Sequence, residues 1–246
     1  MNIKIYDFSH STDKSSVGEI SRFDHIREEL ISGEVIGIDG LFSMRYIDDF
    51  RNALLFWSKT RKPRPHGEAL QDIPVNENFY RIDDEPEKSS APHVYKTYVL
   101  GRISLLEGDL SRLGQFVFSK MLHIQNSLAG TTAQLERAYR ETLYLRPQII
   151  HYPRGGGYLA EHVHQFEPQK FGLILNLSNC GTDYQEGGTF FRGGDEELIQ
   201  GGEIGKKGRV IVFKYDLPHG VNVIDRKSQL SWDAEDGKWS AVLPLY

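Results

Sequence analysis

The chain has 246 residues, with 29 basic residues against 34 acidic ones and a formal net charge of −5. This length suits one large domain with a substantial core, and the charge argues against a nucleic-acid binder that relies on bulk electrostatics. No apolar run approaches the length of a membrane-spanning helix, and the N-terminus lacks the layout of a signal peptide. A single cysteine, Cys180, excludes a cysteine-rich zinc site and fits a reducing, cytoplasmic compartment, so any bound metal must be held by histidine or carboxylate.

Residues 1–146 are expected to form a helix-rich N-terminal support. Helices are predicted where apolar residues recur at steps of three and four, over residues 21–32, 42–59, 109–129 and 132–143. Gly33 and Gly130 follow two of these segments as typical helix stops. Residues 34–39 (EVIGID) read as a strand.

The stretch 60–93 is polar and broken, and it holds five of the ten prolines. It is too long for a passive connector between two elements. We predict a surface loop here, and the alternative is a mobile lid over a site.

Residues 147–246 differ in composition from the N-terminal part, because fifteen of the 24 glycines lie between Gly155 and Gly237. Short apolar segments separated by turns predict eight strands: QIIHY, YLAEHVH, FGLILNLS, GGTFFR, EELIQ, RVIVFK, HGVNVI and WSAVLPL. Eight short strands in about a hundred residues are typical of a compact sandwich or barrel. The expected fold class is α+β, with residues 1–246 forming a single domain.

Three histidines stand in positions that favour a metal site. His162 and His164 are two apart on a predicted strand, so both side chains should face the same side. His219 follows the apolar strand 209–213 after a short turn and is the leading candidate for a third ligand. A single histidine is more often a core or surface residue, but this combination favours a metal such as Fe, Zn, Cu or Ni, for which imidazole is a suitable ligand.

From residue 152 onward the sequence resembles the double-stranded β-helix (jelly-roll) core of the Fe(II)/2-oxoglutarate-dependent dioxygenases, and most closely the prolyl-4-hydroxylase type. Four pieces match in order. Residues 152–164 resemble the "Y-x-x-G-G…H-x-D" entry to the iron site, and residues 186–191 resemble the "GGxTxF" strand. Residues 205–213 resemble the strand before the distal histidine, and residues 237–239 resemble the "G-x-K-W" signature.

The resemblance implies an enzyme that uses Fe(II), 2-oxoglutarate and O2 to oxidise an unactivated C–H bond, most often by hydroxylation. The iron would be bound by His162, His164 and His219, and a small molecule such as an amino acid or natural product is the expected substrate. Lys238 would pair with the distal carboxylate of 2-oxoglutarate. Further hydrogen bonds to this cosubstrate are expected from Ser240, which shares a strand face with Lys238, and from Tyr152 and Asn176.

One position departs from the family pattern, because His164 stands where the family usually has aspartate. His164 could bind the metal as a third imidazole, or it could turn aside and leave a coordination position open, or the site could have lost its metal. Glu161 could replace the missing carboxylate, but strand alternation points it away from the two histidines.

Two other classes remain as alternatives. Cupins share the barrel and often use three histidines and a glutamate, but Glu167 lies only three residues after His164, and Asp216 stands where the second cupin motif has glycine. The other alternative is a non-catalytic barrel that binds a ligand or a protein. Arg154 is read either as a contact for an anionic group at the barrel mouth or as an exposed arginine. The sequence does not predict an oligomeric state.

Overall fold

The computed structural model of the chain describes residues 3–9, 16–61, 63, 76–83, 91–136, 143–193, 198–202 and 204–245. Its helices are α1 (Ser16–Ile31), α2 (Met44–Lys59) and α3 (Gly108–Ala129), and a short 3-10 turn spans Ile103–Leu105. The first four strands are β1 (Ile3–Asp7), β2 (Val35–Asp39), β3 (Asn76–Asp83) and β4 (His93–Leu100). The other eight are β5 (Gln148–Pro153), β6 (Tyr158–His162), β7 (Phe171–Asn176), β8 (Gly188–Arg192), β9 (Leu198–Gln200), β10 (Val210–Lys214), β11 (His219–Asn222) and β12 (Gly237–Val242).

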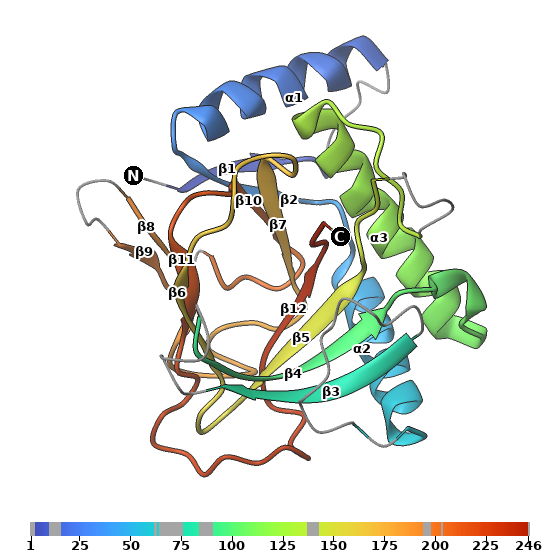
Figure 1. Ribbon diagram of the computed structural model, residues 1–246, viewed down its shortest axis with the longest axis vertical. Coiled ribbons are helices and arrows are strands. Elements are labelled where there is room, and N and C mark those ends of the chain that lie inside the picture. The colour runs from blue at the N-terminus through green and yellow to red at the C-terminus, as the bar shows by residue number, and fades with distance from the viewer. Residues whose placement is uncertain are drawn as a thin grey trace.

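The eight strands from β5 to β12 form the jelly roll that the sequence predicts. The strands form two antiparallel four-stranded layers, ordered β5–β12–β7–β10 and β6–β11–β8–β9. Consecutive strands alternate between the layers, except that β8 and β9 pair with each other in the same layer. The ring of Phe213 on β10 lies 4.9 Å from that of Phe191 on β8 and 4.6 Å from that of His219 on β11, so the layers meet face to face. Each of the eight predicted strands is present, and the chain has the double-stranded β-helix fold (Figure 1).

The N-terminal strands enlarge this core on two sides. Strand β2 pairs with β10, and β1 pairs with β2 in parallel. Strand β4 pairs through residues 96–99 with β5 and through residues 93–94 with β6, so it joins the two layers along one edge. The N-terminal support is therefore helix-rich, as predicted, but it also contributes four strands to the sheet.

The predicted surface loop over 60–93 is wrong for residues 76–83, which form β3 and pair along their whole length with β4. The flanking prolines and charged residues make this strand difficult to recognise from the sequence. Pairing with β4 nevertheless provides its hydrogen bonds, and Phe79 is buried against Val99. Residues 62, 64–75 and 84–90 of the stretch lie outside the described part of the chain.

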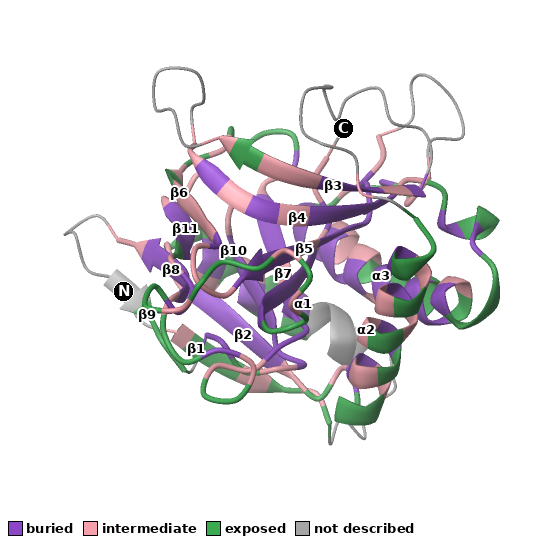
Figure 2. Ribbon diagram, turned by 90° about the horizontal axis from the view of Figure 1, so that it is seen from below, coloured by how far each residue is buried: buried purple, intermediate pink, exposed green. Residues whose placement is uncertain are grey.

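The helices cover the outer face of the layer formed by β5, β12, β7 and β10 and extended by β2 and β1 (Figures 1 and 2). Leu113, Val117 and Met121 of α3 belong to one buried cluster with Leu175 of β7 and Trp239 of β12. Helix α3 ends at Gly130, whose backbone has the left-handed φ of 67° that a glycine stop provides. None of the helices in the described residues is long and apolar enough to cross a membrane.

The helix predicted over 132–143 is wrong in its described part. Residues 132–136 are not helical, and the N–H of Leu145 donates to the carbonyl of Gln134 at 2.8 Å. The N–H of Ala133 donates to the Asn126 side chain at the end of α3, so the chain leaves that helix in an extended form. Residues 137–142 are outside the described residues.

Alternation along β12 decides which of its side chains face the site. Trp239 and Ala241 pack into the core under the helices. Lys238, Ser240 and Val242 therefore face the interior of the jelly roll. The same alternation places Tyr152 of β5, opposite Lys238 in the ladder, on the interior side.

Candidate metal centre

The structure brings the three predicted histidines together at the interior end of two paired strands. His162 ends β6, His219 begins β11, and the two residues are direct partners in the antiparallel ladder. The ring of His162 lies 4.3 Å from that of His219 and 4.8 Å from that of His164. One nitrogen from each ring lies within 4.8 Å of the others. This is the only cluster of three such metal-binding side chains found among the described residues.

Backbone carbonyls orient two of the imidazoles. Nδ1 of His162 lies 3.0 Å from the carbonyl oxygen of Ala160, and Nδ1 of His219 lies 2.8 Å from that of Leu217. Because a carbonyl oxygen only accepts hydrogen bonds, each Nδ1 carries the proton and donates it. The lone pair of a neutral imidazole then resides on Nε2, so in both rings Nε2 is available to bind a metal.

Burial keeps the cluster uncharged. Burial and the neighbouring His162 lower the pKa of His219 to about 3 and that of His164 to about 4. Burial also lowers the pKa of His162. The three side chains are therefore neutral at pH 7, which is the form in which imidazole binds Fe, Zn, Cu or Ni. The residues present fit a divalent transition metal with three nitrogen ligands.

The side chain of His164 faces the cluster for a different reason from the one predicted. Strand β6 ends at His162, so strand alternation does not set the direction of His164. The N–H of His164 instead donates to the carbonyl of Tyr215 at 3.3 Å, and its ring stacks on the Tyr215 ring at 4.3 Å. Contacts with the turn after β10 thus turn this histidine toward the other two.

Neither candidate carboxylate is part of the cluster. Glu161 points away, as predicted, and its side chain forms an ion pair with Arg192 at 2.7 Å. Glu167, the residue nearest to the cupin glutamate position, is exposed and lies 3.8 Å from Lys170. The usual aspartate position is therefore filled by His164 without a replacement acid from these two residues.

The histidines line a cavity of about 540 Å³, which we call the histidine cavity. Its walls come from both layers and from β3 and β4, and they are largely apolar and aromatic. They include Arg81, His93, Tyr95, Ile150, Tyr152, Leu159, Thr189, Phe213, Tyr215 and Val242.

Lys238, Asn176 and Ser240 form a polar group in the interior, and we call it the lysine group. The ammonium group of Lys238 is fully buried and donates to Asn176 Oδ1 at 3.0 Å. Among the described residues no carboxylate forms an ion pair with it, and burial lowers its pKa to about 7. The Ser240 hydroxyl is buried without a hydrogen-bond partner. This donor set fits a carboxylate, which would satisfy both groups.

The lysine group and the histidine cavity are neighbours but not one continuous lining. Tyr152 lines the cavity and is paired with Lys238 across the ladder, and Val242 lines it two residues beyond Ser240. Lys238, Ser240 and Asn176 themselves do not line it. Of the four residues predicted to hold the cosubstrate, Tyr152 thus lines the cavity and the other three do not.

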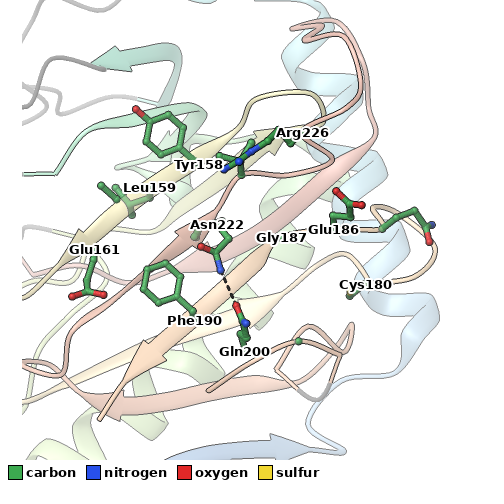
Figure 3. A pocket seen from close by; sticks show the side chains of 15 residues that line it. Tyr158, Leu159, Glu161, Cys180, Glu186, Gly187, Phe190, Gln200, Asn222 and Arg226 are labelled. Atoms are coloured by element: carbon green, nitrogen blue, oxygen red, sulfur yellow. Dashed lines mark hydrogen bonds between the residues drawn. The ribbon is translucent and has the colours of Figure 1, made fainter. Parts of the chain in front are cut away.

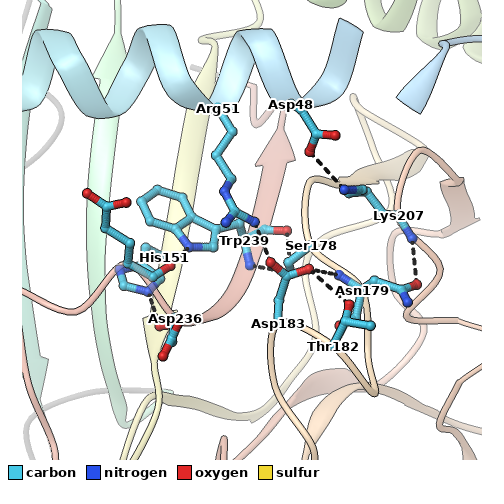
Figure 4. Close-up of polar contacts among 11 residues, drawn as sticks. Asp48, Arg51, His151, Ser178, Asn179, Thr182, Asp183, Lys207, Asp236 and Trp239 are labelled. Atoms are coloured by element: carbon cyan, nitrogen blue, oxygen red, sulfur yellow. Dashed lines mark hydrogen bonds and ion pairs between the residues drawn. The ribbon is translucent and has the colours of Figure 1, made fainter. Parts of the chain in front are cut away.

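The outer side of this region is fixed by polar contacts with α2 (Figure 4). Arg51 forms an ion pair with Asp183 at 2.7 Å, and Lys207 forms one with Asp48 at 2.8 Å. His151 stacks on Trp239 at 4.0 Å, and its Nε2 lies 2.8 Å from the carbonyl oxygen of Asp236. Burial lowers the pKa of His151 to about 3, so this histidine is a neutral core residue rather than a ligand.

A second cavity, of about 710 Å³, lies beside the first (Figure 3). Leu159 and Val221 line both cavities. From the sequence we expect the substrate pocket to be built by residues 155–158, the loop 179–186 and N-terminal segments that include the proline-rich stretch. Tyr158, Cys180 and Glu186 instead line this second cavity.

Arg154 is not available for an external anion. Its guanidinium lies 3.6 Å from Asp225 and 3.5 Å from Asp236, and it donates to the Ser228 hydroxyl at 3.2 Å. The arginine that lines the histidine cavity is Arg81, on the strand missed by the sequence analysis. The alternating pattern of NFYRID, opposite HVYKTYVL, is the signal that could have located it.

Comparison with known proteins supports the fold. No family model and no curated protein matches the chain. Among solved structures, a prolyl hydroxylase from Trichoplax adhaerens in complex with a hypoxia inducible factor peptide aligns over 96% of this chain and 94% of that one, with a TM-score of 0.59 and 11% identity. The non-haem α-ketoglutarate-dependent epimerase SnoN of nogalamycin biosynthesis aligns over 92% and 83% of the two chains, with a TM-score of 0.57 and 8% identity.

A third similar structure is a prolyl-4-hydroxylase from Pseudomonas putida, which aligns over 91% of this chain and 97% of that one, with a TM-score of 0.54 and 10% identity. At such low identity these likenesses show the fold alone. The chain has the fold of the prolyl hydroxylases and related 2-oxoglutarate oxygenases, and the three-histidine cluster lies inside it.

Proposed function

We propose that this chain, whose fold is that of the 2-oxoglutarate oxygenases, is itself a non-haem iron oxygenase that oxidises a C–H bond of a small molecule. Hydroxylation is the expected outcome. The observation that carries the proposal is the convergence of His162, His164 and His219, each with a ligand nitrogen within 4.8 Å of the others. The buried ammonium group of Lys238, which has no acid partner among the described residues, supports the second half of the expected site.

His162, His164 and His219 would hold Fe(II). When bound, Fe(II) and 2-oxoglutarate supply the activation of O2 that the side chains of the chain cannot perform. The chain itself positions Nε2 of His162, Nε2 of His219 and one ring nitrogen of His164, keeps the imidazoles neutral through burial, and excludes water with the aromatic walls of the cavity. Because all three ligands are neutral, the protein adds no negative charge to the metal, unlike a site with one aspartate.

The lysine group would anchor the distal carboxylate of 2-oxoglutarate. Lys238 supplies the positive charge, Ser240 supplies a donor that has no partner, and Asn176 holds the ammonium group in place. A carboxylate beside Lys238 would raise the lysine pKa again, because an opposite charge favours the charged form. Tyr152, which is paired with Lys238 in the ladder and lines the histidine cavity, would lie beside the bound cosubstrate.

A small-molecule substrate is supported by the size of the histidine cavity. Its volume of about 540 Å³ falls within the roughly 300–1,000 Å³ of typical small-ligand pockets. Among similar folds, SnoN belongs to nogalamycin biosynthesis, and the Trichoplax adhaerens enzyme was solved with a peptide. An amino acid or natural product remains our proposed substrate class, and a cytoplasmic location remains our expectation.

Anaerobic titration of the protein with Fe(II) and then 2-oxoglutarate tests the proposal. We expect a weak visible charge-transfer band that appears only when both are present. The His162→Ala/His219→Ala double variant should give no band, whereas His151→Gln, which changes a histidine outside the cluster, should retain it. A folded wild-type protein that gives no band would refute the iron and 2-oxoglutarate assignment and favour a binding protein.

A further inference from the structure

Arg81 occupies an unusual place in the histidine cavity. It lies on β3 directly opposite Tyr95 of β4, and both side chains face the interior. Among the described residues that line the cavity, Arg81 is the only one with a formal charge. The histidines beside it are neutral, so this guanidinium sets the electrostatic potential of the cavity.

The positive charge of Arg81 is not balanced within the described residues. Its Nε atom is buried and has no hydrogen-bond partner, and no described carboxylate forms an ion pair with it. Two other arginines have acid partners: Arg209 forms two hydrogen bonds of 2.8 Å with Asp39, and Arg51 is paired with Asp183. Arg81 is partly buried and has no such partner among the described residues, which favours a ligand that completes its coordination.

Aromatic packing holds the guanidinium group of Arg81 in place. Its Cζ lies 5.5 Å from the centroid of the Tyr95 ring. That ring is stacked on His93 at 4.7 Å and lies edge-to-face against Tyr152 at 5.6 Å. A planar guanidinium fixed in this way presents its N–H donors as a pair, the arrangement that matches a carboxylate.

Arg81 and the three histidines line the same cavity from different positions along the sheet. Strand β3 pairs with β4, and β4 pairs with β6, the strand that ends at His162. These two strands lie two strand spacings apart, about 10 Å, and the registers also place His162 five residues farther along β6 than the level of Arg81 and Tyr95, which adds about 17 Å along the strand direction. Both side chains nevertheless line the same cavity. We propose that the substrate carries a carboxylate that binds Arg81, while its oxidised carbon lies at the histidine cluster of the same cavity. This inference rests on the proposed oxygenase function.

A carboxylate fits this position better than a phosphate. A phosphate dianion normally requires more than one cationic partner, and no second Lys or Arg lines the cavity among the described residues. A carboxylate has a single charge and the planar shape of the guanidinium. The apolar walls formed by Ile150, Leu159 and Phe213 would contact the remaining carbon skeleton.

Binding of matched acids and amides tests the proposal. The probes are hexanoate, 4-methylpentanoate and phenylacetate, each compared with its neutral primary amide and with phenyl phosphate as an anionic control. Dissociation constants are measured by calorimetry under anaerobic conditions, with Fe(II) and saturating 2-oxoglutarate present so that the lysine group is filled. We expect at least one acid to bind 10- to 100-fold more tightly than its amide.

Substitution of Arg81 assigns the preference. Arg81→Met should remove the difference between acid and amide, and Arg81→Lys should retain part of it. Arg45→Met is the matched control, because Arg45 lies on α2 with its side chain 92% exposed. If Arg81→Met does not fold, Arg81→Gln provides the same comparison. An acid preference that persists in a folded Arg81 variant, or no acid that binds more tightly than its amide, would overturn the proposal.

Two further readouts separate this proposal from the proposed function. Arg81→Met should leave the affinity for 2-oxoglutarate within about twofold of the wild type; a loss there instead of in acid binding would make Arg81 part of the cosubstrate site and overturn the inference. If the wild type binds neither Fe(II) nor 2-oxoglutarate, the oxygenase function fails. The acid-versus-amide comparison with the metal-free protein then still decides whether Arg81 is a carboxylate site.

Discussion

Replacing Lys238 with methionine should stabilise the protein while it abolishes cosubstrate binding. Burial lowers the Lys238 pKa from 10.5 to about 7, which at about 1.36 kcal/mol per pKa unit costs about 4 kcal/mol of folding stability at pH 7. Methionine removes that cost but leaves the Asn176 oxygen without its donor, a loss of about 1–3 kcal/mol. The net gain of about 1–3 kcal/mol corresponds to a rise in Tm of several degrees for a domain of this size.

The pH dependence of this gain identifies its cause. Because the folded pKa is depressed, the cost is fully present below pH 7, falls as pH rises toward 10.5, and disappears above it. Urea unfolding at pH 6.5 and pH 9.5 should therefore show a stability gap between the variant and the wild type that narrows at the higher pH. Lys227→Met, at an exposed position, is the control.

Cosubstrate binding provides the second half of this test. Calorimetry should show that Lys238→Met weakens 2-oxoglutarate binding by at least 100-fold while Fe(II) affinity changes little. A variant that is destabilised at both pH values and still binds 2-oxoglutarate would refute the reasoning, because Lys238 would then be a structural residue and not a carboxylate anchor.

Three other changes test separate parts of the site. His164→Ala should weaken metal binding at least tenfold in a competition titration, whereas Glu161→Gln should not; equal affinities for the His164 variant and the wild type would show that His164 is not a ligand. Gly220→Ala would place a methyl group 2.8 Å from the Phe190 ring, so it should displace His219 and lower both metal affinity and Tm; an unchanged affinity would show that β11 can shift freely. Above pH 7 the affinity for 2-oxoglutarate should fall about tenfold per pH unit, because binding must protonate Lys238; a flat profile between pH 7 and pH 8.5 would contradict its low pKa.

The sequence predicted the jelly-roll core well because each of its strands is short, apolar and bounded by turn residues. The three histidines were also identifiable from spacing, although His164 reaches the cluster through Tyr215 and not through strand alternation. The distance between Lys238 and the cavity wall could not be predicted, because it depends on how Tyr152 packs across the ladder.

The strand that makes the N-terminal contribution to the site was missed for a physical reason. Strand β3 has too few apolar residues to be recognised alone, and it forms because β4 provides its hydrogen bonds. Arg81 could therefore not be assigned to the cavity from local sequence. The helix predicted over 132–143 was wrong in its described residues 132–136, because the hydrogen bond from the Leu145 N–H to the Gln134 carbonyl gives this part an extended partner.

The most direct test of the central claim is the conversion of 2-oxoglutarate to succinate in air by the Fe(II)-loaded protein. The wild type should form succinate, with or without a coupled substrate, and His219→Ala should form none while retaining its fold. Succinate formation that is equal in the two proteins, or absent from a wild type that has bound both Fe(II) and 2-oxoglutarate, would contradict the assignment of the three-histidine cluster as the catalytic metal centre.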